Sequence, residues 1–220
     1  MPQLALFLKA SLAQTRGMTR RLFQLFLGLG LYGLSISMIV RAGLGLDPWD
    51  VLTQGVHERF AGPAGISFGM VVNLIGLAVL LLWIPLRQKP GVGTVANVLV
   101  IGTVANFGLG WIPADLALPL RAGLLVGGIV LNGVATGAYV GAGLGPGPRD
   151  GLMTGIVART GWPVKWVRTA IEITVVAVGW LLGGSVGLGT ILYAVAIGPL
   201  VHVFLPMFTI RKTASTKGEG

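Results

Sequence analysis

The sequence predicts an all-α membrane protein with six transmembrane helices, two short re-entrant or half helices, and two inverted-topology repeats. Three observations favour this fold class. Of the 220 residues, 54% are hydrophobic and only 10% are charged, whereas a soluble globular domain carries about 25% charged residues. The basic residues form short clusters between long uncharged runs. The chain also resembles itself at an offset of 100 residues, as positions 42–55 and 142–155 show.

Six segments are long enough to cross the bilayer, since a transmembrane helix needs about 20 predominantly apolar residues. The last uncharged stretch is too long for one helix, and Gly183, Gly184 and Ser185 divide it. The expected crossings are Leu22–Val40, Ile66–Leu86, Val92–Ile112, Ala122–Val140, Val164–Leu182 and Val186–Phe208.

Two shorter segments, Pro48–Phe60 and Pro148–Thr160, do not fit a full crossing. At 1.5 Å per residue each would be roughly 20 Å long, against about 30 Å of hydrocarbon. Each begins with a proline, which suits the first helical position, and an aspartate follows two residues later. We expect them to be re-entrant or half-membrane helices.

The distribution of basic residues sets the predicted orientation, because cytoplasmic loops carry an excess of Lys and Arg. With both termini in the cytoplasm, only Arg41, Arg59 and Arg121 lie on the outer side. The other basic residues are then cytoplasmic: Lys9, Arg16, Arg20, Arg21, Arg87, Lys89, Arg149, Arg159, Lys165, Arg168, Arg211, Lys212 and Lys217. Residues 1–20 are expected to form a cytoplasmic N-terminal segment, and residues 209–220 a cytoplasmic tail.

The internal repeat is carried by AGLGLDPWDVLTQG at 42–55 and AGLGPGPRDGLMTG at 142–155, which agree at eight of fourteen positions without a gap. Repeat 1 covers 21–112 and repeat 2 covers 121–208, each with three crossings and one short helix. Three is an odd number, so the second repeat must be inverted relative to the first. Inverted repeats with broken helices are a transporter arrangement whose binding site lies near the midplane.

The short helices carry the candidate site. Asp50 and Asp150 lie in the first turn of their helices, where a carboxylate can cap the free backbone N–H groups or bind a cation or proton. Arg149 can pair with Asp150, bind an anionic solute, or anchor the cytoplasmic side. The candidate substrate- or ion-binding residues are Asp50, Asp150, Arg149, Pro48, Pro148, Gln54 and Thr154.

Arg168 and Glu172 are four residues apart on the fifth expected crossing, so they share one helix face. They either neutralise each other or act as a gate or proton relay.

Several function classes are disfavoured. The chain has no cysteine and two histidines, so neither a metal site nor a cofactor is expected. No nucleotide-binding or nucleophile motif is present, and we expect no enzyme activity. The net charge of +9 follows the loop pattern rather than a nucleic-acid-binding face.

The stretches AGLGLDPWDVLTQGV, IPLRQKPGVGTVANVLVIG and GAGLGPGPRDGLMTGIVARTG resemble the bacterial YczE/YyaS/YitT family of integral membrane proteins, and most closely its YczE branch. The resemblance extends from Arg21 to Phe208. It implies a multi-pass protein of the bacterial cytoplasmic (inner) membrane, and it supplies no substrate.

The leading functional hypothesis is a secondary transporter or facilitator for a small solute, with a midplane site between the repeats. The alternative is a non-transporting membrane scaffold or accessory protein, which the short loops disfavour. The expected partners are the lipid bilayer and an unknown small solute. Proton coupling, direction, channel or carrier behaviour and oligomeric state stay open.

Overall fold

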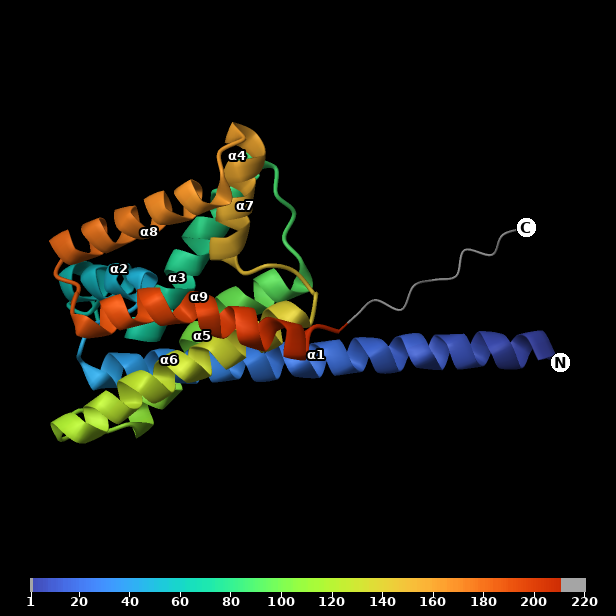
Figure 1. Cartoon of the computed structure of the whole chain (residues 1–220), viewed down its shortest axis with the longest axis horizontal. Coiled ribbons are helices and arrows are strands. Elements are labelled where there is room, and N and C mark those ends of the chain that lie inside the picture. Colours follow the sequence, from blue (N-terminus) through green and yellow to red (C-terminus); the bar gives the residue numbers. More distant parts are fainter. Residues whose placement is uncertain (1, 211–220) are drawn as a thin grey trace.

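The computed structural model describes residues 2–210, with side chains described from Gly17 onward. All regular secondary structure in this part of the chain is helical (Figure 1). The helices are α1 (Pro2–Ala42), α2 (Pro48–Val56), the π-helical turn η1 (His57–Ala61), α3 (Phe68–Leu81), α4 (Trp83–Leu86), α5 (Val92–Trp111), α6 (Leu118–Gly141), α7 (Pro148–Thr160), α8 (Val164–Leu181) and α9 (Leu188–Phe208). The expected cytoplasmic tail lies outside the described residues from 211 onward, and α1 already begins at Pro2.

Within the part of the chain that the structure describes, five helical segments are long and apolar enough to cross a membrane, so this is a multi-pass membrane protein. They are Gly17–Ala42, Phe68–Leu86, Val92–Trp111, Leu118–Gly141 and Leu188–Phe208. The fifth expected crossing, Val164–Leu182, coincides with α8 but is not confirmed as a span. It is 18 residues long and carries Lys165, Arg168 and Glu172.

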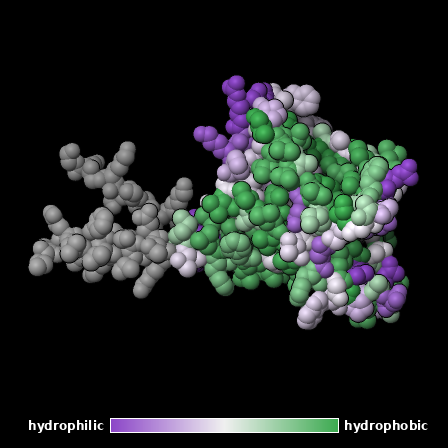
Figure 2. All heavy atoms as spheres, turned by 180° about the vertical axis from the view of Figure 1, so that it is seen from behind, coloured by the Kyte–Doolittle hydropathy of each residue, from purple (hydrophilic) through white to green (hydrophobic). Residues whose placement is uncertain are grey.

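Large apolar side chains cover much of the outer surface (Figure 2). Leu99 is 60% exposed, Phe107 65% and Leu188 82%. Water-soluble monomers rarely expose contiguous apolar patches on this scale. In a bilayer these side chains contact lipid, while the helices satisfy their own backbone hydrogen bonds.

The centre of the molecule is the antiparallel pair α1 and α6 (Figure 1). Glycines allow the two backbones to approach closely. A Cβ on Gly28 would lie 2.6 Å from the backbone nitrogen of Tyr139, and one on Gly128 would lie 2.8 Å from Cγ1 of Ile39. Helix α5 packs beside α1, and α9 packs beside α6.

Contacts between α1 and α6 occur in reciprocal pairs separated by 100 residues. Nη1 of Arg21 donates to the carbonyl of Ala142 at 2.9 Å, and Nε of Arg121 donates to the carbonyl of Ala42 at 2.7 Å. Each arginine therefore binds the chain where it leaves the other long helix and turns toward a short one.

A second reciprocal pair holds the loops before the short helices. The backbone N–H of Gly93 donates to Leu144 at 2.9 Å, and that of Gly189 donates to Leu44 at 2.8 Å. The starts of α5 and α9 thus contact equivalent points of the two loops.

The outer helices break this correspondence. Helix α3 packs along α5, where the amide of Asn73 accepts from the backbone N–H of Gly102 at 3.0 Å. Helix α8 instead packs on α2, with Gly179 against the backbone of Val51 and Leu52. Among the described residues α8 has no extensive packing with α9. Gly198 on α9 accordingly has no neighbouring atom within 4 Å of where a Cβ would stand.

Candidate functional site

The loops that lead into the short helices have nearly the same backbone shape. Gly45 has φ +114° and Gly145 has φ +128°, a region that residues with a Cβ rarely adopt. A Cβ on Gly45 would also meet the backbone of Gly187 at 2.8 Å. The repeated Ala-Gly-Leu-Gly motif therefore encodes a tight turn that directs each short helix into the protein.

The N-terminus of α2 is capped by Asp47. Its Oδ1 accepts from the backbone N–H groups of Trp49 at 2.9 Å and Asp50 at 3.1 Å. The expectation that Asp50 and Asp150 cap their own helices is wrong, because α7 has no side-chain cap and α2 uses Asp47. The capping position precedes the first proline, and only a side chain there reaches back over the free N–H groups.

Arg149 connects the two short helices. It lies at the second position of α7, and its Nη1 is 3.7 Å from Oδ1 of Asp47. Its Nη2 is 3.9 Å from Oδ1 of Asp50. The guanidinium also lies over the ring of Trp49, 5.0 Å from the ring centroid. The sequence suggested Asp150 as the ion-pair partner of Arg149, but in the structure its ion pairs are with Asp47 and Asp50 of the other half.

Asp150 has a different partner. Its Oδ2 accepts a hydrogen bond of 2.9 Å from the hydroxyl of Tyr139 on α6. Asp150 is half-buried, whereas Asp47 and Asp50 are fully buried. Arg149 therefore pairs with the two fully buried carboxylates, while Asp150 is held by Tyr139.

Part of this carboxylate cluster lacks hydrogen-bond partners. Oδ2 of Asp47 and both carboxylate oxygens of Asp50 are buried and accept no hydrogen bond from the described part of the chain. A buried polar atom without a partner costs free energy, so such atoms are rare in folded proteins. These unpartnered oxygens belong to the two carboxylates that pair with Arg149.

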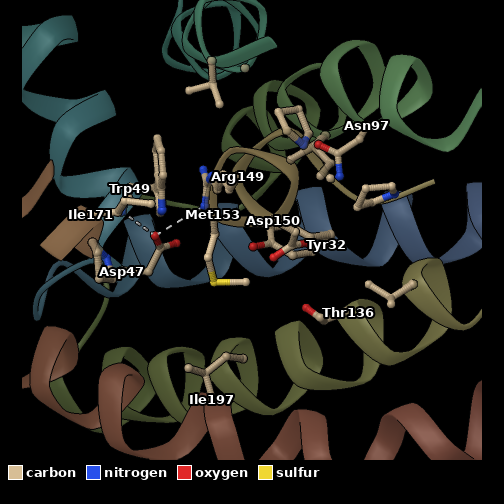
Figure 3. A pocket seen from close by; sticks show the side chains of 18 of the residues that line it. Tyr32, Asp47, Trp49, Asn97, Thr136, Arg149, Asp150, Met153, Ile171 and Ile197 are labelled. Carbon is tan, nitrogen blue, oxygen red and sulfur yellow. Dashed lines mark hydrogen bonds and ion pairs between the residues drawn. The ribbon is translucent and has the colours of Figure 1, made fainter. Parts of the chain in front are cut away.

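A cavity of about 400 Å³ opens beside this cluster, within the usual range for small-molecule sites (Figure 3). It lies between the N-termini of α2 and α7 and receives side chains from both halves. Its polar lining includes Tyr32, Asp47, Asn97, Thr136, Tyr139, Asp150 and Tyr193, and its apolar lining includes Val72, Ile101, Met153 and Ile197.

Several of the sequence-predicted site residues line the cavity: Pro48, Pro148, Arg149, Asp150, Arg168 and Glu172. Arg168 donates from Nε to Glu172 at 2.8 Å. Asp50 does not line the cavity. It pairs with Arg149, which does. Gln54 accepts from the backbone N–H of Ser185 at 2.8 Å, and Thr154 donates to Gly151 at 3.2 Å, so neither faces the cavity.

The sequence-based set missed Asp47, Trp49 and the tyrosines. Asp47 precedes a helix-starting proline, so helix-capping rules could have found it. The chain contains three tyrosines, and all three line the cavity. In a chain this apolar, the rarity of tyrosine was the available signal. Among the described residues, no group of three or more His, Cys, Asp or Glu side chains could hold a metal ion.

Comparison with known proteins places the chain among membrane proteins. Residues 19–206 match a family model described as a family of unknown function (DUF6198). An uncharacterized protein of Haemophilus influenzae is 40% identical over 181 residues, covering 82% of this chain and 81% of the relative. The uncharacterized membrane protein YczE of Bacillus subtilis is 34% identical, covering 88% and 93%, and YyaS of the same organism is 25% identical, covering 82% and 90%.

No solved structure matches the chain. The resemblance to YczE and YyaS expected from the repeated motifs is confirmed by these relatives. The chain therefore belongs to the DUF6198 family and is similar to the membrane protein YczE.

Proposed function

We propose that this protein is a secondary transporter or facilitator for a small solute, which binds in the cavity where α2 and α7 meet. The observation that carries the proposal is the convergence of two short helix N-termini on a cavity lined by charged residues inside a membrane protein. Charged groups inside a membrane protein are costly and usually lie on a solute or ion pathway.

The proposal includes two inverted repeats, 21–112 and 121–208. Its support is the reciprocal hydrogen bonding of Arg21 with Ala142 and of Arg121 with Ala42. Two units related by a twofold axis across the α1–α6 pair would exchange contacts in this way. The crossing α8 then has the role in repeat 2 that α3 has in repeat 1.

The unequal packing of the outer helices favours a carrier. Helix α3 packs directly against α5, whereas the cavity separates α8 from α9. If the repeats exchange these two arrangements, the cavity opens on the other side of the membrane, as in alternating access. Gly198 supports this, because it has the position in α9 that Gly102 has in α5, yet nothing packs on it here.

The proposed location is the bacterial cytoplasmic membrane, with both termini in the cytoplasm. The support is the strong excess of Lys and Arg on that side. In this orientation Arg168 and Glu172 lie in the half of α8 that is nearer the cytoplasm.

The test is a flux assay in which the identity of the solute is itself the readout. Proteoliposomes are filled with a bacterial metabolite extract and diluted, and mass spectrometry identifies solutes that leave faster than from empty liposomes. We expect at least one solute to leave the proteoliposomes faster than it leaves the empty liposomes. The assay is run once with and once without a proton gradient. Asp150→Asn should reduce that loss, and Asp115→Asn, in the exposed loop after α5, should not. No protein-dependent loss, together with stable co-purification of one protein partner, would favour the scaffold alternative.

A further inference from the structure

The charges around the cavity do not balance. Asp47 and Asp50 pair with one guanidinium, that of Arg149, and a third carboxylate, Asp150, lines the same cavity. Arg168 and Glu172 are bonded to each other and cancel. The N-termini of α2 and α7 each contribute the equivalent of about half a positive charge. With all three carboxylates ionised, the cluster lacks about one positive charge even when both helix N-termini are counted.

This shortage lies at the cavity wall. Asp47 is 1% exposed and lines the cavity, and its Oδ2 has no hydrogen-bond partner among the described residues. Asp150 also lines the cavity and is less deeply buried, so a solute can reach it. In a low-dielectric interior an uncompensated carboxylate is costly, so a cationic group bound here would gain a large share of that energy.

The remaining walls suit an organic cation. Tyr32, Trp49, Tyr139 and Tyr193 line the cavity, and aromatic faces attract ammonium groups. One face of Trp49 is already occupied by a cation, the guanidinium of Arg149. A cavity of about 400 Å³ is also far larger than a bare inorganic ion requires.

We infer that the cavity binds a small organic solute carrying one positive charge, as a protonated amine or a quaternary ammonium, with Asp150 and Asp47 as its counter-charges. This inference rests on the proposed transport function, since it names the chemical class of the solute bound at the same site.

The test is a charge series of nearly constant shape, measured by titration calorimetry on the protein in lipid nanodiscs. The probes are neopentylamine, neopentyl alcohol and pivalate, which are positive, neutral and negative, with tetramethylammonium as the quaternary probe. We expect the two cations to bind, and the alcohol and pivalate to bind at least about tenfold more weakly. Preference for pivalate or for the alcohol would overturn the inference.

The carboxylates are tested with charge-removing variants of similar shape. Asp150→Asn should weaken neopentylamine binding about tenfold or more, because a hydrogen bond to a charged group is lost. Asp47→Asn should act in the same direction, since asparagine still caps a helix. The control Asp115→Asn should bind as the wild type does. Equal affinity in Asp150→Asn and wild type contradicts the assignment. If Asp150→Asn is unstable, Asp47→Asn alone decides.

Inorganic ions provide the remaining arm. Titrations with sodium chloride and potassium chloride at equal ionic strength test whether a simple cation fills the site. Stabilisation by one of these ions without amine binding would overturn the inference. Amine binding without flux would leave the inference standing and remove the transport proposal. Flux of an anionic or neutral solute, with no amine binding, would support the transport proposal and overturn the inference about a cationic solute.

Discussion

Arg149 is the side chain on which the centre of the molecule depends, because it neutralises carboxylates that are themselves fully buried. Its guanidinium contacts Asp47 and Asp50 from the opposite short helix and covers the ring of Trp49. Removing it would leave two buried carboxylates without the cation that faces them. The exposed pair Arg168–Glu172 has the same charges but remains in contact with solvent.

This contrast gives a prediction about stability. We expect Arg149→Met to lower the free energy of unfolding by about 3–5 kcal/mol, as for other broken buried ion pairs. Arg168→Met should change it by about 1 kcal/mol or less. Thermal unfolding of both variants in the same detergent measures the difference. Asp50→Asn added to Arg149→Met should recover part of the loss, and equal effects at Arg149 and Arg168 would contradict this account.

At the scale of the elements, the sequence predicts much of the helix layout and little of the helix packing. The starting prolines and the repeated motif located α7 as observed and began α2 at Pro48. They could not reveal that α2 continues as the π-helical turn His57–Ala61, because that depends on tertiary contacts. For the same reason Gln54 was assigned to the site although it binds the loop at Ser185.

The two glycines at equivalent positions of α5 and α9 give a prediction about helix packing. A Cβ on Gly102 would collide with the carbonyl of Gly69 and the side chain of Asn73, so Gly102→Ala should cost about 1–3 kcal/mol of stability. Gly198→Ala meets no neighbour and should be neutral or stabilising by up to about 1 kcal/mol. Thermal unfolding midpoints of the two variants and the wild type, measured in the same detergent, test these two expected changes in stability. If α8 must close on α9 during transport, Gly198→Ala should still slow flux, and unchanged flux would argue against that closure.

At the scale of the whole molecule, the absence of cysteine makes the orientation directly measurable. We predict that Asp115→Cys, in the loop between α5 and α6, reacts with a membrane-impermeant maleimide in intact cells. Lys89→Cys, in the loop between α4 and α5, should react only after permeabilisation. Labelling of both positions in intact cells would contradict the positive-inside assignment.

The same background allows the proposed movement of α3 to be blocked. A Cβ on Gly76 would lie 3.8 Å from Cα of Val98, so cysteines at the two positions are within disulfide range. We expect the pair Gly76→Cys and Val98→Cys to crosslink under mild oxidation, to stop flux, and to regain it on reduction. The control is Gly76→Cys alone under the same oxidant. Full flux in the crosslinked protein would mean that α3 need not leave α5.

The exchange of arginines between α1 and α6 also constrains when the protein can mature during synthesis. The carbonyl of Ala42 is bound by Arg121, a residue 79 positions later in the chain. At about 5–20 residues per second, translation reaches that arginine on the order of 4–16 s after Ala42. Until then the loop that positions Asp47 and Asp50 lacks its partner, and the first half must wait inside the membrane, with two carboxylates and no Arg149, for the second half to be made.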